Sequence, residues 1–153
     1  MKKYLALLLL SICANIWAQN SVSTLLQYGC YRTAVSFSIF EKNDNLLLMV
    51  SFVSDTNSIP DDPQIQFRFF DETVLILNGI NKKNETTREG GWLIKENYHN
   101  CVAEFPITQE EVERLKIGIK KIRMTTIPNI IEREYKKDKV GEKLYQQYKK
   151  SKF

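Results

Sequence analysis

The sequence predicts a single α+β domain: an antiparallel β-sheet, curled or folded into a two-layer sandwich, with a short helix before the last strand and a second helix at the C-terminus. Strand-length segments with alternating or continuous apolar residues recur between residues 33 and 126, whereas helical signals begin only after residue 107. The composition, with 43% hydrophobic and 26% charged residues, 6 Gly and 4 Pro, is typical of a globular chain and excludes collagen-like and low-complexity classes.

The predicted strands follow one another as hairpins. Residues 33–40 alternate apolar and polar side chains with one face largely polar, and residues 46–53 form a continuous apolar run; residues 41–45 supply a turn of about five residues between them. Two prolines mark residues 55–63 as a loop, because proline cannot donate a ladder hydrogen bond. The predicted strands are 33–40, 46–53, 65–70, 73–77, 92–95, 101–105 and 119–126, with a further short strand around 25–31. Residues 78–91 are polar and predict a long flexible loop of the kind that often carries function.

A capped helix is predicted over residues 109–117. Thr108 is a favourable N-cap, and Glu111 stands three residues further on, which is the capping-box pattern. Gly118 is the residue type expected just past a helix C-terminus, because glycine adopts the left-handed conformation without strain. The helix should therefore end immediately before Gly118.

A second helix is predicted from about residue 138 to residue 150. Val140, Leu144 and Tyr148 recur at helical spacing and form its buried stripe. Residues 128–137 fit either the start of one longer helix or a loop, and the pattern does not decide between them.

The N-terminus has the three-part pattern of a secretory signal peptide. Lys2 and Lys3 precede an apolar run over residues 4–12, and Ala18 supplies a small residue for cleavage. Lipid attachment at Cys13 is the alternative, but the bulky residue before it departs from the lipoprotein pattern. We therefore expect a periplasmic or secreted product, with the signal peptide, residues 1–18, cleaved from a single domain, residues 19–153.

Two cysteines, Cys30 and Cys101, remain after removal of the signal peptide. An even number of cysteines in an exported chain predicts a disulfide bond between them. Two buried thiols that pack as small hydrophobic groups are the alternative, because a domain of this size does not need a covalent link.

Charge is distributed unevenly along the chain. Residues 19–110 carry seven Lys or Arg against twelve Asp or Glu, whereas residues 111–153 carry thirteen against six. An exported basic segment meets acidic proteins, acidic glycans or anionic lipids. An envelope protein or glycan is thus a better candidate partner than a small molecule, an anionic membrane surface is a further candidate, and nucleic acid is disfavoured.

The C-terminal third of the chain resembles a known group of proteins. The segments FPITQEEVERLKIGIKKIRM and EREYKKDKVGEKLYQQYKK are similar to the C-terminal part of small exported bacterial proteins of unknown function. The resemblance contains no catalytic motif and implies no activity. It implies a signal peptide and a strand-rich architecture.

Residues for common catalytic chemistry are missing or badly spaced. His99 is the only histidine, and on a strand its side chain would stand about 6–7 Å from that of Cys101, too far for direct proton transfer. One histidine and two distant cysteines cannot form a zinc shell, and residues 55–62 lack the glycine turn of a calcium loop. The adjacent carboxyls at residues 61–62 and 71–72 point apart, whereas a glycosidase needs two across a cleft. The sequence therefore predicts no catalytic residue, cofactor site or metal site.

By exclusion, the leading hypothesis is an exported, non-catalytic protein that binds a macromolecular partner in the cell envelope. The alternatives are a hydrolase acting on an envelope or dietary polymer, and a carrier of a lipid or other small ligand. Candidate binding residues are two aromatic side chains and four lysines of the tail: Trp92, Tyr98, Lys136, Lys137, Lys139 and Lys143. Sheet packing of the aromatics and a solvated helix face for the lysines are the plain structural alternatives.

Cleavage after Ala18 is directly testable. Intact-mass measurement of the protein recovered from its own host should give the mass of residues 19–153, because the signal peptide is removed during export. A cytosolic species that keeps residues 1–18 and three reduced cysteines would contradict export.

Overall fold

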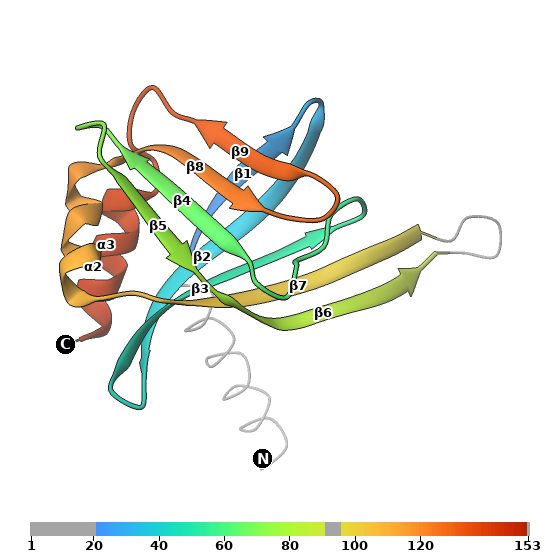
Figure 1. Cartoon of the computed structure of the whole chain (residues 1–153), viewed down its shortest axis with the longest axis horizontal. Helices are drawn as coiled ribbons and strands as arrows, with labels where there is room; N and C mark the ends of the chain where they lie inside the picture. The colour runs from blue at the N-terminus through green and yellow to red at the C-terminus, as the bar shows by residue number, and fades with distance from the viewer. Residues whose placement is uncertain (1–20, 91–95, 153) are drawn as a thin grey trace, which may run out of the picture.

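The computed structural model describes residues 21–90 and 96–152 (Figure 1). Within them, nine strands form one antiparallel sheet in the order β5-β4-β8-β9-β1-β2-β3-β7-β6. The strands are β1 Val22–Tyr28, β2 Tyr31–Lys42, β3 Asn45–Ser54, β4 Gln64–Phe69, β5 Val74–Asn78, β6 Ile80–Glu89, β7 Glu96–Pro106, β8 Ile119–Thr125 and β9 Ile130–Glu134. The helices are α2, Gln109–Arg114, which continues as a 3-10 turn over Leu115–Ile117, and α3, Gly141–Ser151.

The sheet curls into a nearly closed barrel (Figure 1). Helices α2 and α3 lie together at one end of the barrel, and the β6–β7 hairpin extends past the other end. The predicted antiparallel sheet with two short helices is confirmed at this level, but the first helix precedes two strands, β8 and β9, whereas one strand was expected after it. The signal peptide and the strand expected at residues 92–95 lie outside the described residues.

The barrel closes at Gly79, the single residue between β5 and β6. Strand β5 pairs with β4, whereas β6 pairs with β7, so the two edges of the curled sheet are joined through this residue. The backbone N–H of Gly79 donates to the carbonyl oxygen of Pro63 at 2.8 Å. A Cβ atom at this position would lie 2.5 Å from the ring of Phe105, so the close approach requires glycine.

The prediction of a flexible loop over residues 78–91 is wrong, because most of this segment is β6. Strand β6 is the last strand in the sheet and extends beyond the barrel, so most of its side chains are exposed and polar. A strand with solvent on both faces needs no alternation of apolar and polar residues, and the periodicity signal is missing. Residues 96–100, expected as a loop, belong to β7.

The predicted turn between the first two long strands is shorter than expected. Strand β2 runs to Lys42 and β3 begins at Asn45, which leaves Asn43 and Asp44 as a two-residue turn. Both have positive φ, 51° and 61°. Left-handed backbone at both central positions matches the twist of the flanking strands, and Asn and Asp tolerate it better than most residues.

Side chains from facing strands fill the barrel. Phe37 on β2 meets Phe67 on β4 edge to face, with ring centroids 6.3 Å apart and planes inclined by 67°. Both rings are fully buried. Strand β9 lies within the unassigned residues 128–137; Ile131 is its only buried residue, so its sequence has no clear alternation.

The capped helix is confirmed. The backbone N–H of Glu111 donates to the Thr108 hydroxyl at 3.2 Å, and the Glu111 carboxylate accepts from the backbone N–H of Thr108 at 2.8 Å. Helix α2 and its 3-10 continuation together span residues 109–117, and Gly118 follows with φ of 87°. Local signals define this element completely, because its caps are made by side chains within it.

Asp138 fixes the position of α3. Its carboxylate accepts hydrogen bonds from the backbone N–H groups of Val140, Gly141 and Glu142, at 2.7–3.1 Å, and so caps the first turn of the helix. It also accepts from the backbone N–H of Ile119 at 3.0 Å, which ties the helix to the start of β8. The helix therefore begins at residue 141, three residues later than expected. A Cβ at Gly141 would lie 2.7 Å from the Leu115 carbonyl oxygen, so the two segments are in close contact.

Replacing Asp138 by alanine should lower the free energy of unfolding by about 2–4 kcal/mol, because four backbone donors lose a charged acceptor. Asp138→Asn should lose less, since an amide oxygen still accepts. Urea denaturation measures both changes. A loss no larger than that of the exposed control Asp62→Ala would contradict the role assigned to Asp138.

Candidate functional site

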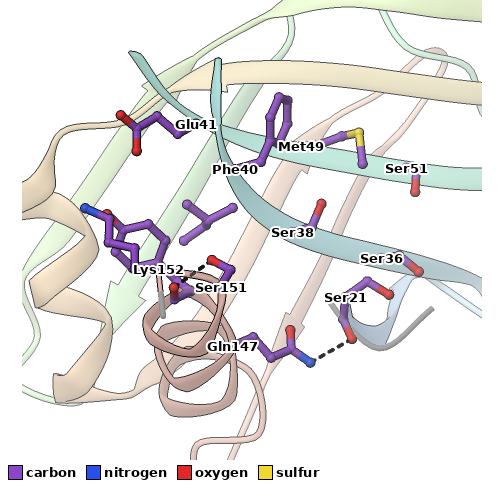
Figure 2. Close-up of a pocket in the computed structure, with 12 residues that line it drawn as sticks. Ser21, Ser36, Ser38, Phe40, Glu41, Met49, Ser51, Gln147, Ser151 and Lys152 are labelled. Carbon is purple, nitrogen blue, oxygen red and sulfur yellow. Dashed lines mark hydrogen bonds between the residues drawn. The ribbon is translucent and has the colours of Figure 1, made fainter. Parts of the chain in front are cut away.

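A groove of about 950 Å³ lies between the C-terminal half of α3 and the β2–β3 hairpin (Figure 2). It is lined by the residue before β1, by residues of β2 and β3, and by the end of α3. The lining residues are Ser21, Ser36, Ser38, Ile39, Phe40, Glu41, Met49, Ser51, Gln147, Tyr148, Ser151 and Lys152.

The floor of the groove is the outer face of the sheet. Ser36 and Ser38 alternate along β2 with Val35 and Phe37, which are fully buried in the barrel. Successive side chains of a strand point to opposite faces, so Ser36, Ser38 and Phe40 face the groove from the outer side of β2. Ile39, a buried residue of the same strand, also lines the groove, so the groove borders the core at this point.

Strand pairing sets the arrangement of hydroxyls on this floor. Ser36 stands opposite Ser51 on β3, and Ser38 stands opposite Met49. Side chains of directly opposed residues lie about 4.5–5.5 Å apart at Cβ. On the floor, the Ser36 and Ser51 side chains thus form one pair, and the Ser38 hydroxyl and the Met49 thioether form the next. Phe40 lies beyond them on β2 (Figure 2).

Two hydrogen bonds hold α3 as the wall of the groove. The Gln147 side-chain amide donates to the carbonyl oxygen of Ser21 at 3.1 Å (Figure 2). The Tyr148 hydroxyl donates to the Gln109 side-chain oxygen at 2.8 Å. They tie the helix to the start of β1 and to α2. The spacing between wall and floor is therefore set by tertiary contacts rather than by a flexible loop.

Glu41 and Lys152 are the two charged residues of the lining. The Lys152 ammonium lies 5.0 Å from the ring centroid of Tyr148. The Tyr148 hydroxyl, together with the Glu41 carboxylate, raises the pKa of Lys152 above its usual range, so this amine is charged at neutral pH. Hydroxyl and amide groups make up the rest of the polar lining, which suits a ligand without strong charge.

A second groove, of about 500 Å³, lies over β8, β9 and the end of β1. Its carboxylates are engaged by cations on neighbouring strands. Glu132 pairs with Lys121 at 2.8 Å, and Glu134 pairs with Arg68 at 3.5 Å. These ion pairs lie on the exposed face of the sheet and neutralise both carboxylates, so neither of them is an unpaired acid or base.

Tyr98 and the four lysines named from the sequence do not line the first groove. Tyr98 lies on the projecting part of β7, where its hydroxyl donates to the Glu96 carboxylate. Trp92 lies outside the described residues. The four lysines are exposed, in the β9–α3 connection and the first turn of α3: Lys136, Lys137, Lys139 and Lys143.

Sequence reasoning missed the groove residues, although one signal was present. The serines of residues 33–40 predict a polar outer face, but a polar face is ordinarily solvated. Only the packing of α3 against residue 21 makes the face hollow. That contact joins the two ends of the described chain, and local patterns carry no information about it.

The structure does not contain the predicted disulfide bond, because Cys30 and Cys101 are both free thiols. Cys30 is exposed in the β1–β2 turn, whereas Cys101 is buried on β7. Cys101 on β7 pairs with Phe52 on β3, and Phe52 pairs with Val35 on β2. Cys30 lies about five residues before Val35, so the two cysteines are separated by two strand spacings across the sheet and about five residues along it, roughly 19 Å. A disulfide needs Cα atoms within about 7 Å. Burial raises the pKa of the Cys101 thiol.

Comparison of the chain with protein-family models, with curated proteins and with solved structures finds no match. In residues 21–90 and 96–152, no group of three or more His, Cys, Asp or Glu side chains is placed to hold a metal ion. Within the same residues, no helix is both long enough and apolar enough to cross a bilayer.

The two thiols should differ in reactivity. In the folded chain of residues 19–153, a thiol reagent should modify Cys30 within minutes and leave Cys101 unmodified, because the buried thiol is inaccessible and hard to deprotonate. Mass spectrometry should show one adduct before unfolding and two after it, and Cys30→Ala should show none before unfolding. Absence of native adducts without reductant, with two after reduction, would indicate a disulfide after all.

Proposed function

We propose that this chain is an exported, non-catalytic binding protein, and that the groove between α3 and β2–β3 holds a segment of a macromolecular partner in the cell envelope. The lining of the groove carries this proposal. Neutral hydroxyls and apolar side chains share its floor, and Glu41 is its single carboxylate. The signal-peptide pattern of residues 1–18 supports the location, in the periplasm or outside the cell.

The chemistry of the groove suits an uncharged polymer segment. Ser38 and Ser51 can each donate and accept a hydrogen bond, so they match the amide groups of an extended peptide or the hydroxyls of a glycan. The Ser36 hydroxyl is bonded to the Ser23 hydroxyl at 2.8 Å and keeps a lone pair that can accept from a ligand. Phe40 and Met49 supply apolar contact area, and methionine adapts to different shapes. The volume lies at the upper end of the roughly 300–1,000 Å³ of ligand-binding pockets.

A hydrolase is less well supported. A glycosidase needs two carboxyl groups facing each other across the substrate. Glu41 has no such counterpart in the first groove, and the Glu132 and Glu134 carboxylates of the second are paired with Lys121 and Arg68. Neither groove presents a free acid opposite a free base.

A carrier with an internal cavity is also less well supported. We propose that the two halves of the curled sheet, β5-β4-β8-β9-β1 and β2-β3-β7-β6, face each other like the layers of a sandwich. The Phe37–Phe67 contact supports this arrangement, and Phe69 and Phe105 are also fully buried. Both grooves lie on outer faces of the sheet, whereas a carrier needs an enclosed apolar space.

Ser38→Trp tests the groove directly. The indole would fill the space between β2 and α3 without touching the core, because residue 38 faces outward. Immobilised protein of residues 19–153 should capture its partner from the native cell envelope, and the variant should capture at least about tenfold less. Quantitative mass spectrometry and glycan analysis of the captured material measure this loss.

Gln66→Trp is the matched control, because residue 66 lies on the outer face of β4, away from the groove. It should capture as much as the unmodified chain. Equal capture by Ser38→Trp and the unmodified chain, with both variants folded, would contradict the proposed binding site.

A further inference from the structure

The end of the described chain is strongly basic. Residues 136–152 contain seven lysines, no arginine and two acidic residues. One of the acids, Asp138, directs its carboxylate to four backbone N–H groups and makes no ion pair with a described lysine. Glu142 is the only other acidic residue of the segment itself, and Glu113 and Glu41, from elsewhere in the chain, interact with Lys149 and Lys152 respectively.

All seven of these lysines are exposed, and none has an ion-pair partner among the described residues. Lys149 and Lys152 lie over the rings of Tyr145 and Tyr148, which leaves five lysines without such a contact. We call them the lysine surface: Lys136, Lys137, Lys139, Lys143 and Lys150. The described lysines between residues 82 and 121 behave differently, since each pairs with a glutamate: Lys82, Lys83, Lys116, Lys120 and Lys121. Uncompensated lysine charge is therefore concentrated at the C-terminal segment.

Helical spacing aligns three of these charges. Lys139, Lys143 and Lys150 are four and seven residues apart, which places them on one side of α3 and the turn before it. The opposite side, with Val140 and Leu144, is buried against the rest of the fold. Helix α3 lies with α2 at one end of the barrel (Figure 1), so the exposed lysines of α3 belong to that end of the molecule.

We propose that the lysine surface docks this chain onto an anionic phospholipid bilayer. Lysine is a compact charge on a flexible stem, and a cluster of lysines is attracted to the diffuse negative potential of such a membrane. Arginine is the residue that grips individual phosphates in a fixed geometry, and this segment contains none. The chemistry thus fits a charged surface better than one specific phosphate site.

Attachment is electrostatic and does not require insertion. The apolar side of α3 packs against the 3-10 turn and the barrel, so it is not available to enter the lipid. Electrostatic attraction between exposed charges is screened over about 8 Å at physiological salt. Binding should therefore be strong at low salt and weak at high salt, in contrast to binding by an exposed amphipathic helix.

Vesicle sedimentation with the processed chain, residues 19–153, tests the proposal. The chain should bind vesicles that contain phosphatidylglycerol and should bind pure phosphatidylcholine vesicles at least about tenfold more weakly. The triple variant K139Q/K143Q/K150Q should lose about 100-fold in affinity for the anionic vesicles, at about fivefold per lysine. Sodium chloride at about 0.5 M should abolish binding of the unmodified chain.

The matched control removes three positive charges elsewhere. R32Q/K42Q/R88Q has the same net charge as the lysine-surface variant but changes exposed residues on β2 and β6. It should bind anionic vesicles within about threefold of the unmodified chain, because only nearby charges contribute strongly. Equal loss in both triple variants would overturn the proposal, as would binding that is insensitive to salt.

The assay also separates membrane docking from other partners. Tighter binding to an acidic glycan such as heparin, or to DNA, than to anionic vesicles would overturn the assignment to lipid. Thermal unfolding should be unchanged in K139Q/K143Q/K150Q, since all three side chains are exposed. Ser38→Trp should bind vesicles normally, so failure of the groove proposal and failure of membrane docking give different results.

Discussion

The carboxylate of Asp138 is the constraint on which the functional surfaces depend. It binds the first turn of α3 and the first residue of β8 at the same time. The helix therefore has one position relative to the barrel, reinforced by the close contact of Gly141 with Leu115. Both the wall of the groove and the row of exposed lysines belong to this helix, so a shift of its N-terminus would move both.

Helix α3 uses three parts of its surface differently. Val140 and Leu144 complete the core, Gln147 and Tyr148 face the groove, and the lysines face solvent. This division follows from the helical period, because neighbouring residues in the chain point about 100° apart. Under the two proposals, one short helix thus contacts the barrel core, the bound partner and the membrane through three different sides.

The sequence predicted those elements whose determinants are local. The helix over residues 109–117 is fixed by Thr108, Glu111 and Gly118, all adjacent to it, and the long strands β2 and β3 by their own apolar patterns. Strands β6 and β9 were missed for the opposite reason. Their side chains face solvent or make ion pairs with neighbouring strands, such as Glu132 with Lys121, so the pattern that marks a strand is absent.

The candidate site was less predictable than the fold. Its residues come from positions 21, 36–41, 49–51 and 147–152, and only the curled sheet brings them together. The disulfide prediction failed for a related reason, because the even number of cysteines carried no information on strand register. The exposed lysines, by contrast, could be identified from composition and helical spacing alone. The sequence could not predict that they form no ion pairs, because that depends on which acidic side chains lie nearby in the fold.

Among the described residues, strand β6 ends the sheet without a further strand beside it. Its far end lies in the β6–β7 hairpin that projects from the barrel (Figure 1), and such an edge can recruit strands from other molecules and seed aggregates. Lys82, Lys83 and Arg88, together with the register shift near residue 82, oppose that pairing by charge and irregular geometry. The polar character that hid this strand from sequence analysis thus also opposes edge-to-edge pairing between molecules.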